Sequence, residues 1–234
     1  MKLIADYHTH TVHSHGTGRV EDNVEAAIKR GLDTVGISDH SVAHYLYGVK
    51  KHRLDDYVSC INKAKKAYKD RINIKTGIEL NLTGLDGSVD MPRSCKFDVV
   101  ILGYHKAAIC RNLRTAWTFA AGSCFGQAEK ITDAYMRAVQ RHHIDIVAHP
   151  GYGVPVDYRK LAGACADYGT LFEINNKHSD LSAENLNEAA LTGVKFVISS
   201  DAHSPEHVGL APNALQLVRE AGIDPSRIVN VVED

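Results

Sequence analysis

The first residues of chemical interest are four histidines that fall within residues 5–16, in the stretch ADYHTHTVHSHG. They follow a short apolar run, and later apolar runs along the chain also end in imidazole or carboxylate side chains. One histidine after a strand would mean little, but this repetition predicts that the side chains converge on one site. The residues of this set are His8, His10, Asp39, His40, Glu79, His105, His149, Asp201 and His203.

The residue types and their local spacing indicate a metal centre. Residues two apart in an extended strand point to the same side, so His8 and His10 can reach one ion, as can Asp201 and His203. Imidazoles and carboxylates without thiolates fit zinc, iron or manganese, and the excess of histidine favours zinc. The set is too large for one four-coordinate ion and fits two or three.

Short apolar segments alternate with helical patterns along the chain that must position these residues. Strands are predicted at residues 3–7, 34–38, 72–80, 97–104, 144–149, 170–176 and 194–203. Helices are predicted at residues 20–32, 54–68 and 128–141, from about 157, and at 182–193 and 206–222. Between them, residues 81–92 are expected to form a loop or hairpin, and a long connection follows residue 104.

This alternation implies an α/β fold with a parallel sheet and helices outside it. Seven predicted strands in 234 residues favour a distorted, TIM-like (β/α)7 barrel over a doubly wound sheet, with residues 1–234 as one catalytic domain. The C-terminal strand ends form the active-site face in parallel α/β folds. The metal-capable residues fall at those ends.

The composition excludes several other classes of protein. A formal net charge of −1 provides no general attraction for a nucleic-acid backbone, so we do not expect nucleic acid as a partner. No apolar stretch is long enough for a signal peptide or a membrane span, which predicts a cytoplasmic protein without a membrane partner. Five scattered cysteines without CxxC pairs, Cys124 among them, argue against a disulfide framework and a thiolate zinc site.

The ordered motifs DYHTHTVHSHG, GISDH, TGIEL, LGYH, AHPG and SSDAHSP, which span Asp6 to Pro205, resemble those of the polymerase and histidinol phosphatase (PHP) family. The segment FEINN at residues 172–176 is similar to one in the PHP phosphatases with three metal ions. The resemblance implies a distorted seven-stranded barrel with a trinuclear site at the C-terminal strand ends.

The resemblance also implies which residues hold each ion. The first ion would be held by His8, His10, Glu79 and Asp201, the second by a bridging Glu79 with His105 and His149, and the third by His15, His40 and His203.

The loop ligand is less certain than the strand-end ligands. Several relatives place the third histidine of the opening motif where this chain has Gly16, so His15 is preferred and His13 stays open. Asp39 is expected either to orient an imidazole or to cap a helix. The remaining histidines, for which structural roles are favoured, are His44, His52, His142, His143, His178 and His207.

A cluster of about three divalent ions, zinc most of all and otherwise manganese or iron, predicts hydrolysis by an activated water. The expected substrate is a small phosphate monoester, with Glu79, Asp201 and His203 taking part in catalysis. Histidinol phosphate hydrolysis, C–N hydrolysis of the amidohydrolase type, a nuclease-like PHP module and a metal-binding protein without turnover are the alternatives. The sequence leaves the oligomeric state open.

Substrate contacts are the part of the site for which the sequence offers only general indications. Arg111, Arg114 and Arg159 are candidates for binding phosphate, with a structural role equally open for each. Residues 81–92 and 106–126 are expected to form loops that determine specificity.

Overall fold

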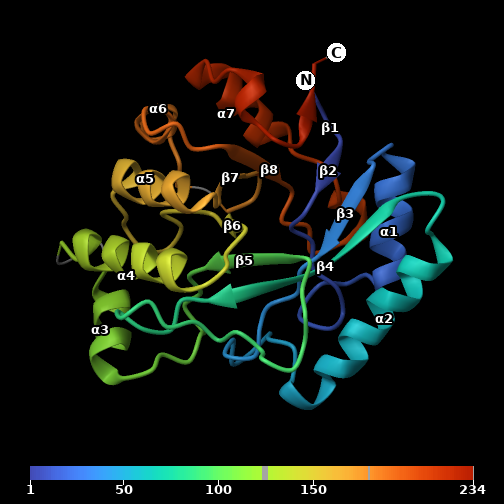
Figure 1. The fold of residues 1–234 in the computed structure, drawn as a ribbon, viewed down its shortest axis with the longest axis horizontal. Coiled ribbons are helices and arrows are strands. Elements are labelled where there is room, and N and C mark those ends of the chain that lie inside the picture. Colours follow the sequence, from blue (N-terminus) through green and yellow to red (C-terminus); the bar gives the residue numbers. More distant parts are fainter. Residues whose placement is uncertain (123–125, 179, 234) are drawn as a thin grey trace.

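The computed structural model, which describes residues 1–122, 126–178 and 180–233, is built around a parallel sheet of seven strands (Figure 1). Neighbouring strands along the chain are neighbours in the sheet, in the order β2-β3-β4-β5-β6-β7-β8. The strands are β2 (Ala5–Asp6), β3 (Thr34–Ile37), β4 (Asn73–Asn81), β5 (Val99–Gly103), β6 (Ile146–Val147), β7 (Leu171–Asn175) and β8 (Phe196–Ser199). The predicted seven-stranded (β/α) barrel is confirmed.

The seam between the first and last strands is joined by a segment near the C-terminus. The buried Asn230 side chain donates from Nδ2 to the carbonyl oxygens of Ala5 and Ile198, each at 2.7 Å, and accepts from Ile198 N at 3.0 Å. Thr9 and Ala202 add an isolated parallel bridge between the segments that follow β2 and β8. One buried amide therefore fastens the barrel where its two outer strands meet.

The first predicted strand, residues 3–7, is divided in the structure. Residues Lys2–Leu3 form β1, which pairs antiparallel with β9 (Val231–Val232), and only Ala5–Asp6 enters the barrel. Because β1 and β9 are paired, the two ends of the chain lie close together (Figure 1).

Helices lie outside the sheet, as Figure 1 shows. They are α1 (Val20–Lys29), α2 (Leu54–Ala67), α3 (Leu113–Ala121), α4 (Ala128–Arg141), α5 (Tyr158–Tyr168), α6 (Ala183–Ala190) and α7 (Pro212–Ala221), with 3-10 turns at Lys51–Arg53, Pro205–His207 and Pro225–Arg227. None of the helices among the described residues is both long and apolar enough to cross a membrane.

Two predicted segments differ from the structure. The helix expected at 206–222 begins only at Pro212, because Gly209 has a φ of 73° that interrupts a helix and Pro212 suits a first helical turn. Helix α3 lies within the predicted connection. It buries Thr115, Thr118 and Phe119 on one side but exposes the apolar Leu113 and Trp117, so its sequence lacks the one-sided apolar pattern that reveals a helix.

The barrel interior is divided between an apolar layer and a polar layer. A small cluster of buried residues, separate from the main core, contains Val99, Ile101, Ile146, Ala148 and Val197. Ile101 pairs with Glu79 on the neighbouring strand, so both side chains face the same side of the sheet. Glu79 therefore borders the apolar layer, and the polar layer follows toward the C-terminal ends of the strands.

Candidate metal centre

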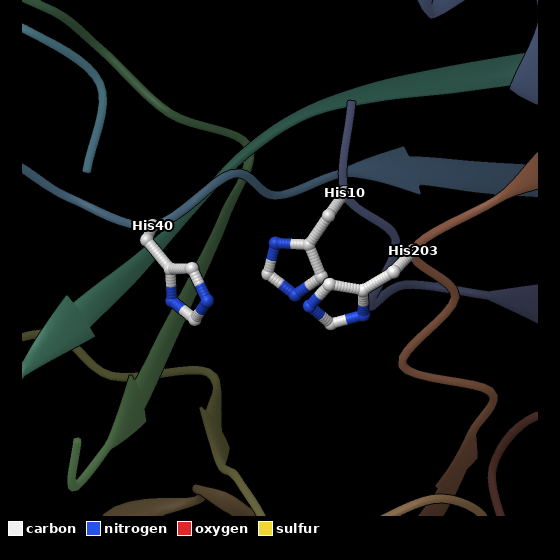
Figure 2. Close-up of side chains that lie close together, drawn as sticks. All are labelled: His10, His40 and His203. Atoms are coloured by element: carbon white, nitrogen blue, oxygen red, sulfur yellow. The ribbon is translucent and has the colours of Figure 1, made fainter. Parts of the chain in front are cut away.

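All the strand-end residues singled out by sequence lie at the C-terminal ends of the barrel strands. Figure 2 shows the rings of His10, His40 and His203 turned toward a common space from three different segments. Three overlapping groups of possible ligand atoms, each within 4.8 Å of one another, occur among the described residues. They are His10 with His40 and His203, His8 with His10 and Asp201, and His40 with Glu79 and His105.

Glu79 lies at the middle of this arrangement and is completely buried. Its Oε1 atom is 3.0 Å from Nε2 of both His105 and His149. Its Oε2 atom is 2.6 Å from Nδ1 of His40 and 3.4 Å from Nε2 of His8. His10 Nε2 is also 3.6 Å from Oε2. The two carboxylate oxygens thus face different sets of imidazoles, an arrangement that suits a bridging ligand.

Asp201 is the second carboxylate that faces His8 and His10. Its Oδ1 is 3.2 Å from Nε2 of His10 and 3.8 Å from Nε2 of His8. Asp201 has a φ of 51°, and His149 has a φ of 30°, whereas L-residues rarely adopt positive φ values. Such backbone strain is concentrated at functional sites in proteins, where neighbouring structure enforces it.

Buried polar atoms without hydrogen-bond partners are concentrated at this site. They include His8 Nε2, both ring nitrogens of His10, His15 Nδ1, His40 Nδ1, Glu79 Oε2 and Asp201 Oδ1. His40 Nδ1 and Glu79 Oε2 are close, yet their orientation does not make a hydrogen bond. Leaving a buried polar group without a hydrogen-bond partner costs about 1–3 kcal/mol. A cluster of so many such groups fits a site at which they bind cations together. The donor set, nitrogen and carboxylate oxygen without sulfur, suits zinc, iron or manganese.

The protonation of the acidic ligands fits cation binding. Burial would raise the pKa of Glu79, but its interactions with the surrounding imidazoles, His105 first among them, hold the pKa well below its usual value. Burial would also raise the pKa of Asp201, but its interactions with His8 and His10 outweigh burial and hold the pKa well below its usual value. Both carboxylates are therefore ionised at neutral pH, as metal binding requires.

The imidazoles fall into two classes. Burial lowers the pKa of His10 to about 3 and that of His40 well below its usual value, so both are neutral ligands at pH 7. Burial also acts on His8, but the surrounding carboxylates, Glu79 and Glu173 first among them, raise its pKa well above the usual value. Positive charge is thus favoured between these carboxylates, and a metal ion at His8 Nε2 would supply it.

His15 and His13, the two candidates for the loop ligand, lie in different surroundings. The His15 ring centre lies 4.2 Å from that of His203 and 4.9 Å from that of His40. The His13 ring instead contacts Tyr57 edge-on at 5.3 Å. The structure thus brings His15 to the cluster and directs His13 to the side of helix α2.

Asp39 has neither of its two predicted roles. Its carboxylate accepts from Thr11 N at 2.8 Å, from Thr11 Oγ1 at 2.6 Å, and from Ser14 Oγ. It therefore holds the loop that presents His15, rather than an imidazole or a helix end. Burial raises the pKa of Asp39 to about 6 despite these hydrogen bonds. The prediction was wrong because the partner is a loop that is distant in sequence and has no periodic pattern.

Glu173 is the main site residue that the sequence analysis missed. It is completely buried, and its Oε1 is 2.8 Å from Nδ1 of His8. Its Oε2 accepts from His149 N at 2.7 Å and from Asn175 Nδ2 at 2.9 Å. Metal-bound imidazoles commonly donate their second nitrogen to such a carboxylate, which fixes the ring and its tautomer. The signal was present in FEINN, a charge inside an apolar strand.

A second positioning chain supports His105. Its Nδ1 lies 2.8 Å from Asn81 Oδ1, and Asn81 Nδ2 donates to Asp90 Oδ2 at 2.8 Å. Asp90 belongs to the predicted hairpin region, in which Leu82 and Val89 form an antiparallel bridge. Gly103 lies against the neighbouring ligand ring. A Cβ atom at this position would be 2.7 Å from His149 Cε1, so only glycine fits there. The hairpin thus contributes to ligand geometry.

The predicted arginine contacts lie away from these ligands. Arg111 Nη1 is 3.0 Å from Asp86 Oδ2, and Arg114 lines the same surface groove. Arg159 Nη1 is 3.7 Å from Glu188 Oε2, between helices α5 and α6. The ion pairs of Arg111 and Arg159 are structural. Cys124 lies outside the described residues.

Two histidines with an expected structural role border the centre instead. The His44 ring centre is 4.8 Å from that of His40, and the His178 ring centre is 6.4 Å from that of His149. Burial lowers the pKa of each to about 4. Both lie in loops, where no local sequence pattern distinguishes a residue near a metal from any other polar residue.

Comparison with known proteins agrees with the geometry of this centre. Residues 6–200 match the model of the PHP domain family. The chain is 29% identical to a probable phosphatase of Thermoanaerobacter sp. (strain X514), over 98% of this chain and 91% of the relative. It is 27% identical to a probable phosphatase of Aeromonas hydrophila, over 98% of this chain and 90% of the relative.

The fold is also found in a solved structure. Histidinol phosphate phosphatase from Lactococcus lactis, in complex with zinc, L-histidinol and phosphate, superposes with a TM-score of 0.69 at 18% identity. The match covers 96% of this chain and 95% of that protein. At this identity the likeness shows the fold alone, which agrees with the predicted barrel.

Proposed function

Since the chain belongs to the PHP domain family, we propose that it is a metal-dependent phosphatase that hydrolyses a small phosphate monoester at a site for about three divalent ions. The names of the relatives support a phosphatase, and the zinc of the Lactococcus lactis enzyme supports metal dependence. Zinc is the preferred ion, and manganese or iron are the alternatives.

The observation that carries the proposal is the bridging position of Glu79. One carboxylate oxygen faces His105 and His149, and the other faces His8 and His40. A carboxylate with this placement would be shared by two cations, and paired cations about 3.5–4 Å apart suit phosphoryl transfer. His15 and His203 would complete a third ligand group with His40.

The residues of the chain divide the work of the reaction among them. When bound, divalent ions lower the pKa of a coordinated water toward about 7 and offset the charge of the phosphate. Glu79 would set the spacing of the ions, while Glu173 and Asn81 fix the rings of His8 and His105. Asp201 Oδ1, which is ionised and has no hydrogen-bond partner, would bind an ion together with His8 and His10 and so lie beside the attacking water.

The product alcohol must leave on the side opposite the attacking water. In an in-line displacement, the P–O bond to the alcohol breaks as the new P–O bond forms, and the alkoxide takes up one proton. His203, at the exposed edge of the cluster, lies where the leaving oxygen would emerge. Because His203 Nδ1 lies 2.9 Å from the Asp201 carbonyl oxygen and Nε2 would bind an ion, the alkoxide would take this proton from solvent at that edge.

The test combines metal analysis with phosphate release. Purified protein is expected to contain about three equivalents of zinc, manganese or iron, and to release phosphate from one or more sugar, nucleotide, hydroxy-acid or amino-alcohol phosphates. His10→Ala should lose both metal and activity, whereas His52→Ala, on an exposed turn, should lose neither. Amide or lactone turnover without phosphate release would instead support an amidohydrolase, and a fully metallated but inert protein would overturn the proposal.

A further inference from the structure

A small pocket opens beside the exposed edge of the metal centre. Its volume is about 320 Å³, which suits a small molecule or one part of a larger one. On the inner side it reaches Asp201 and His203, and on the outer side it is bounded by residues of the Pro205–His207 turn and of helix α7. The lining residues are Asn176, Lys177, Ser200, Asp201, His203, His207, Leu210 and Asn213.

Lys177 is held at the boundary between the pocket and the centre. Its Nζ atom lies 2.8 Å from Nδ1 of His203. Its backbone is fixed, because Asn175 Oδ1 accepts from Lys177 N at 2.8 Å and from His178 N at 2.7 Å. The buried Asn175 side chain also donates to Asp201 Oδ2 at 3.2 Å, so the loop that carries Lys177 is joined directly to a ligand of the cluster.

The contact between Lys177 and His203 competes with another one. His203 Nδ1 also lies 2.9 Å from the carbonyl oxygen of Asp201. A ring nitrogen that donates its hydrogen to this carbonyl cannot accept one from an ammonium group. That tautomer leaves Nε2 available to a metal ion, and it leaves the Lys177 ammonium in need of another acceptor.

The pocket offers that ammonium no carboxylate. Among its described lining residues, Asp201 is the sole acid, and its two oxygens face His10 and Asn175. His203 and His207 are imidazoles, and His207 Nδ1 is paired with Ser204 Oγ at 2.9 Å. Lys177 is therefore the one lysine or arginine among the described lining residues, no carboxylate of the pocket is paired with it, and Leu210 forms the apolar side.

We propose that this pocket binds the alcohol part of the substrate, and that Lys177 selects an alcohol bearing a carboxylate or another anionic group. The inference rests on the proposed phosphatase function and names its substrate class: phosphate monoesters of small hydroxy acids. An ester whose alcohol bears a protonated amine would place two positive charges together and be disfavoured. Lys177 is a specificity-determining residue in this account.

The test compares two esters of similar size and opposite charge, 2-phosphoglycolate and O-phosphoethanolamine. The wild-type enzyme is expected to prefer phosphoglycolate. Lys177→Met should lower kcat/KM for phosphoglycolate by about ten- to a hundredfold, chiefly through KM, and leave that for phosphoethanolamine unchanged or raised. Lys177→Arg should retain the preference. Lys160→Met, which removes an exposed lysine of helix α5, is the matched control and should change neither value.

A binding measurement separates this inference from the proposed function. Calorimetry on the metal-loaded protein with phosphate should detect glycolate in the wild type, weaker glycolate binding in Lys177→Met, and no comparable binding of ethanolamine. Equal binding of both alcohols, or glycolate binding unaffected by Lys177→Met, would overturn the inference whether or not phosphate is released. Phosphate release with no dependence on Lys177 would overturn it while leaving the phosphatase proposal intact.

Discussion

The two sides of the metal centre are built differently. On the inner side, His8 and His105 each have a second ring nitrogen fixed by Glu173 or Asn81, and Glu79 is completely buried. On the outer side, His15 comes from a loop and its Nδ1 has no hydrogen-bond partner, while His203 contacts the exposed Lys177. From this difference we expect an inner part that binds ions tightly and an outer part that adapts to substrate.

The largest effect is expected from removing the shared ligand. Glu79→Gln has nearly the same shape but loses the charge that both ligand pairs face, so activity should fall by at least about a thousandfold. Metal analysis should show the loss of more than one ion per chain. Circular dichroism would check that the barrel is still folded, and loss of a single ion with activity retained would contradict a bridging role.

A smaller effect should follow from disturbing the inner side indirectly. Glu173→Gln weakens the acceptor that orients His8, and changes of this kind typically cost about 10–100-fold in metal affinity or activity. Competition with a chelator, followed by residual activity, measures the affinity. Glu188→Gln, at an exposed position on helix α6, is the matched control. If both variants lose metal at the same chelator concentration as the wild type, the inner side is not held by Glu173.

Variants on the outer side should lose less activity and fewer ions. His15→Ala is expected to lose about one ion and roughly tenfold in activity, because one ligand of a single group is removed. His13→Ala should leave metal content unchanged, since that ring contacts Tyr57 instead. Metal analysis and activity assays under the same conditions compare the two variants. The reverse result would assign the loop ligand to His13.

The smallest effect is expected at the residue that holds this loop. Asp39→Asn keeps the size of the side chain but loses the charge that strengthens its hydrogen bonds to Thr11 and Ser14. A loosened loop should weaken binding of the outer ion several-fold, with the inner ions unaffected. Metal titration at fixed pH would detect it, and an equal weakening of every ion would show that the two sides are not independent.

The same division explains what the sequence could predict. His8, His10, Glu79 and His149 follow apolar strands, and parallel strands bring their C-terminal ends together, so the order of motifs was enough to locate them. Their supports were harder to find. Asp39 acts on a loop 25–28 residues away, and Asn81 acts through a hairpin carboxylate.

Helix α3 and the segment around Asn230 are parts of the fold that the sequence did not predict. The exposed apolar residues of α3 hide its periodicity, and the buried Asn230 that fastens the seam lies outside any predicted element. Such contacts depend on which segments meet in three dimensions. A single sequence records the composition of these segments, but not their partners.

The account depends most on cations gathered around Glu79, and anomalous diffraction from crystals of metal-loaded protein tests this directly. We expect about three peaks, two of them separated by about 3.5–4 Å with the Glu79 carboxylate between them. Loaded crystals with no peak beside Glu79, or with a single ion that Glu79 does not contact, would contradict it.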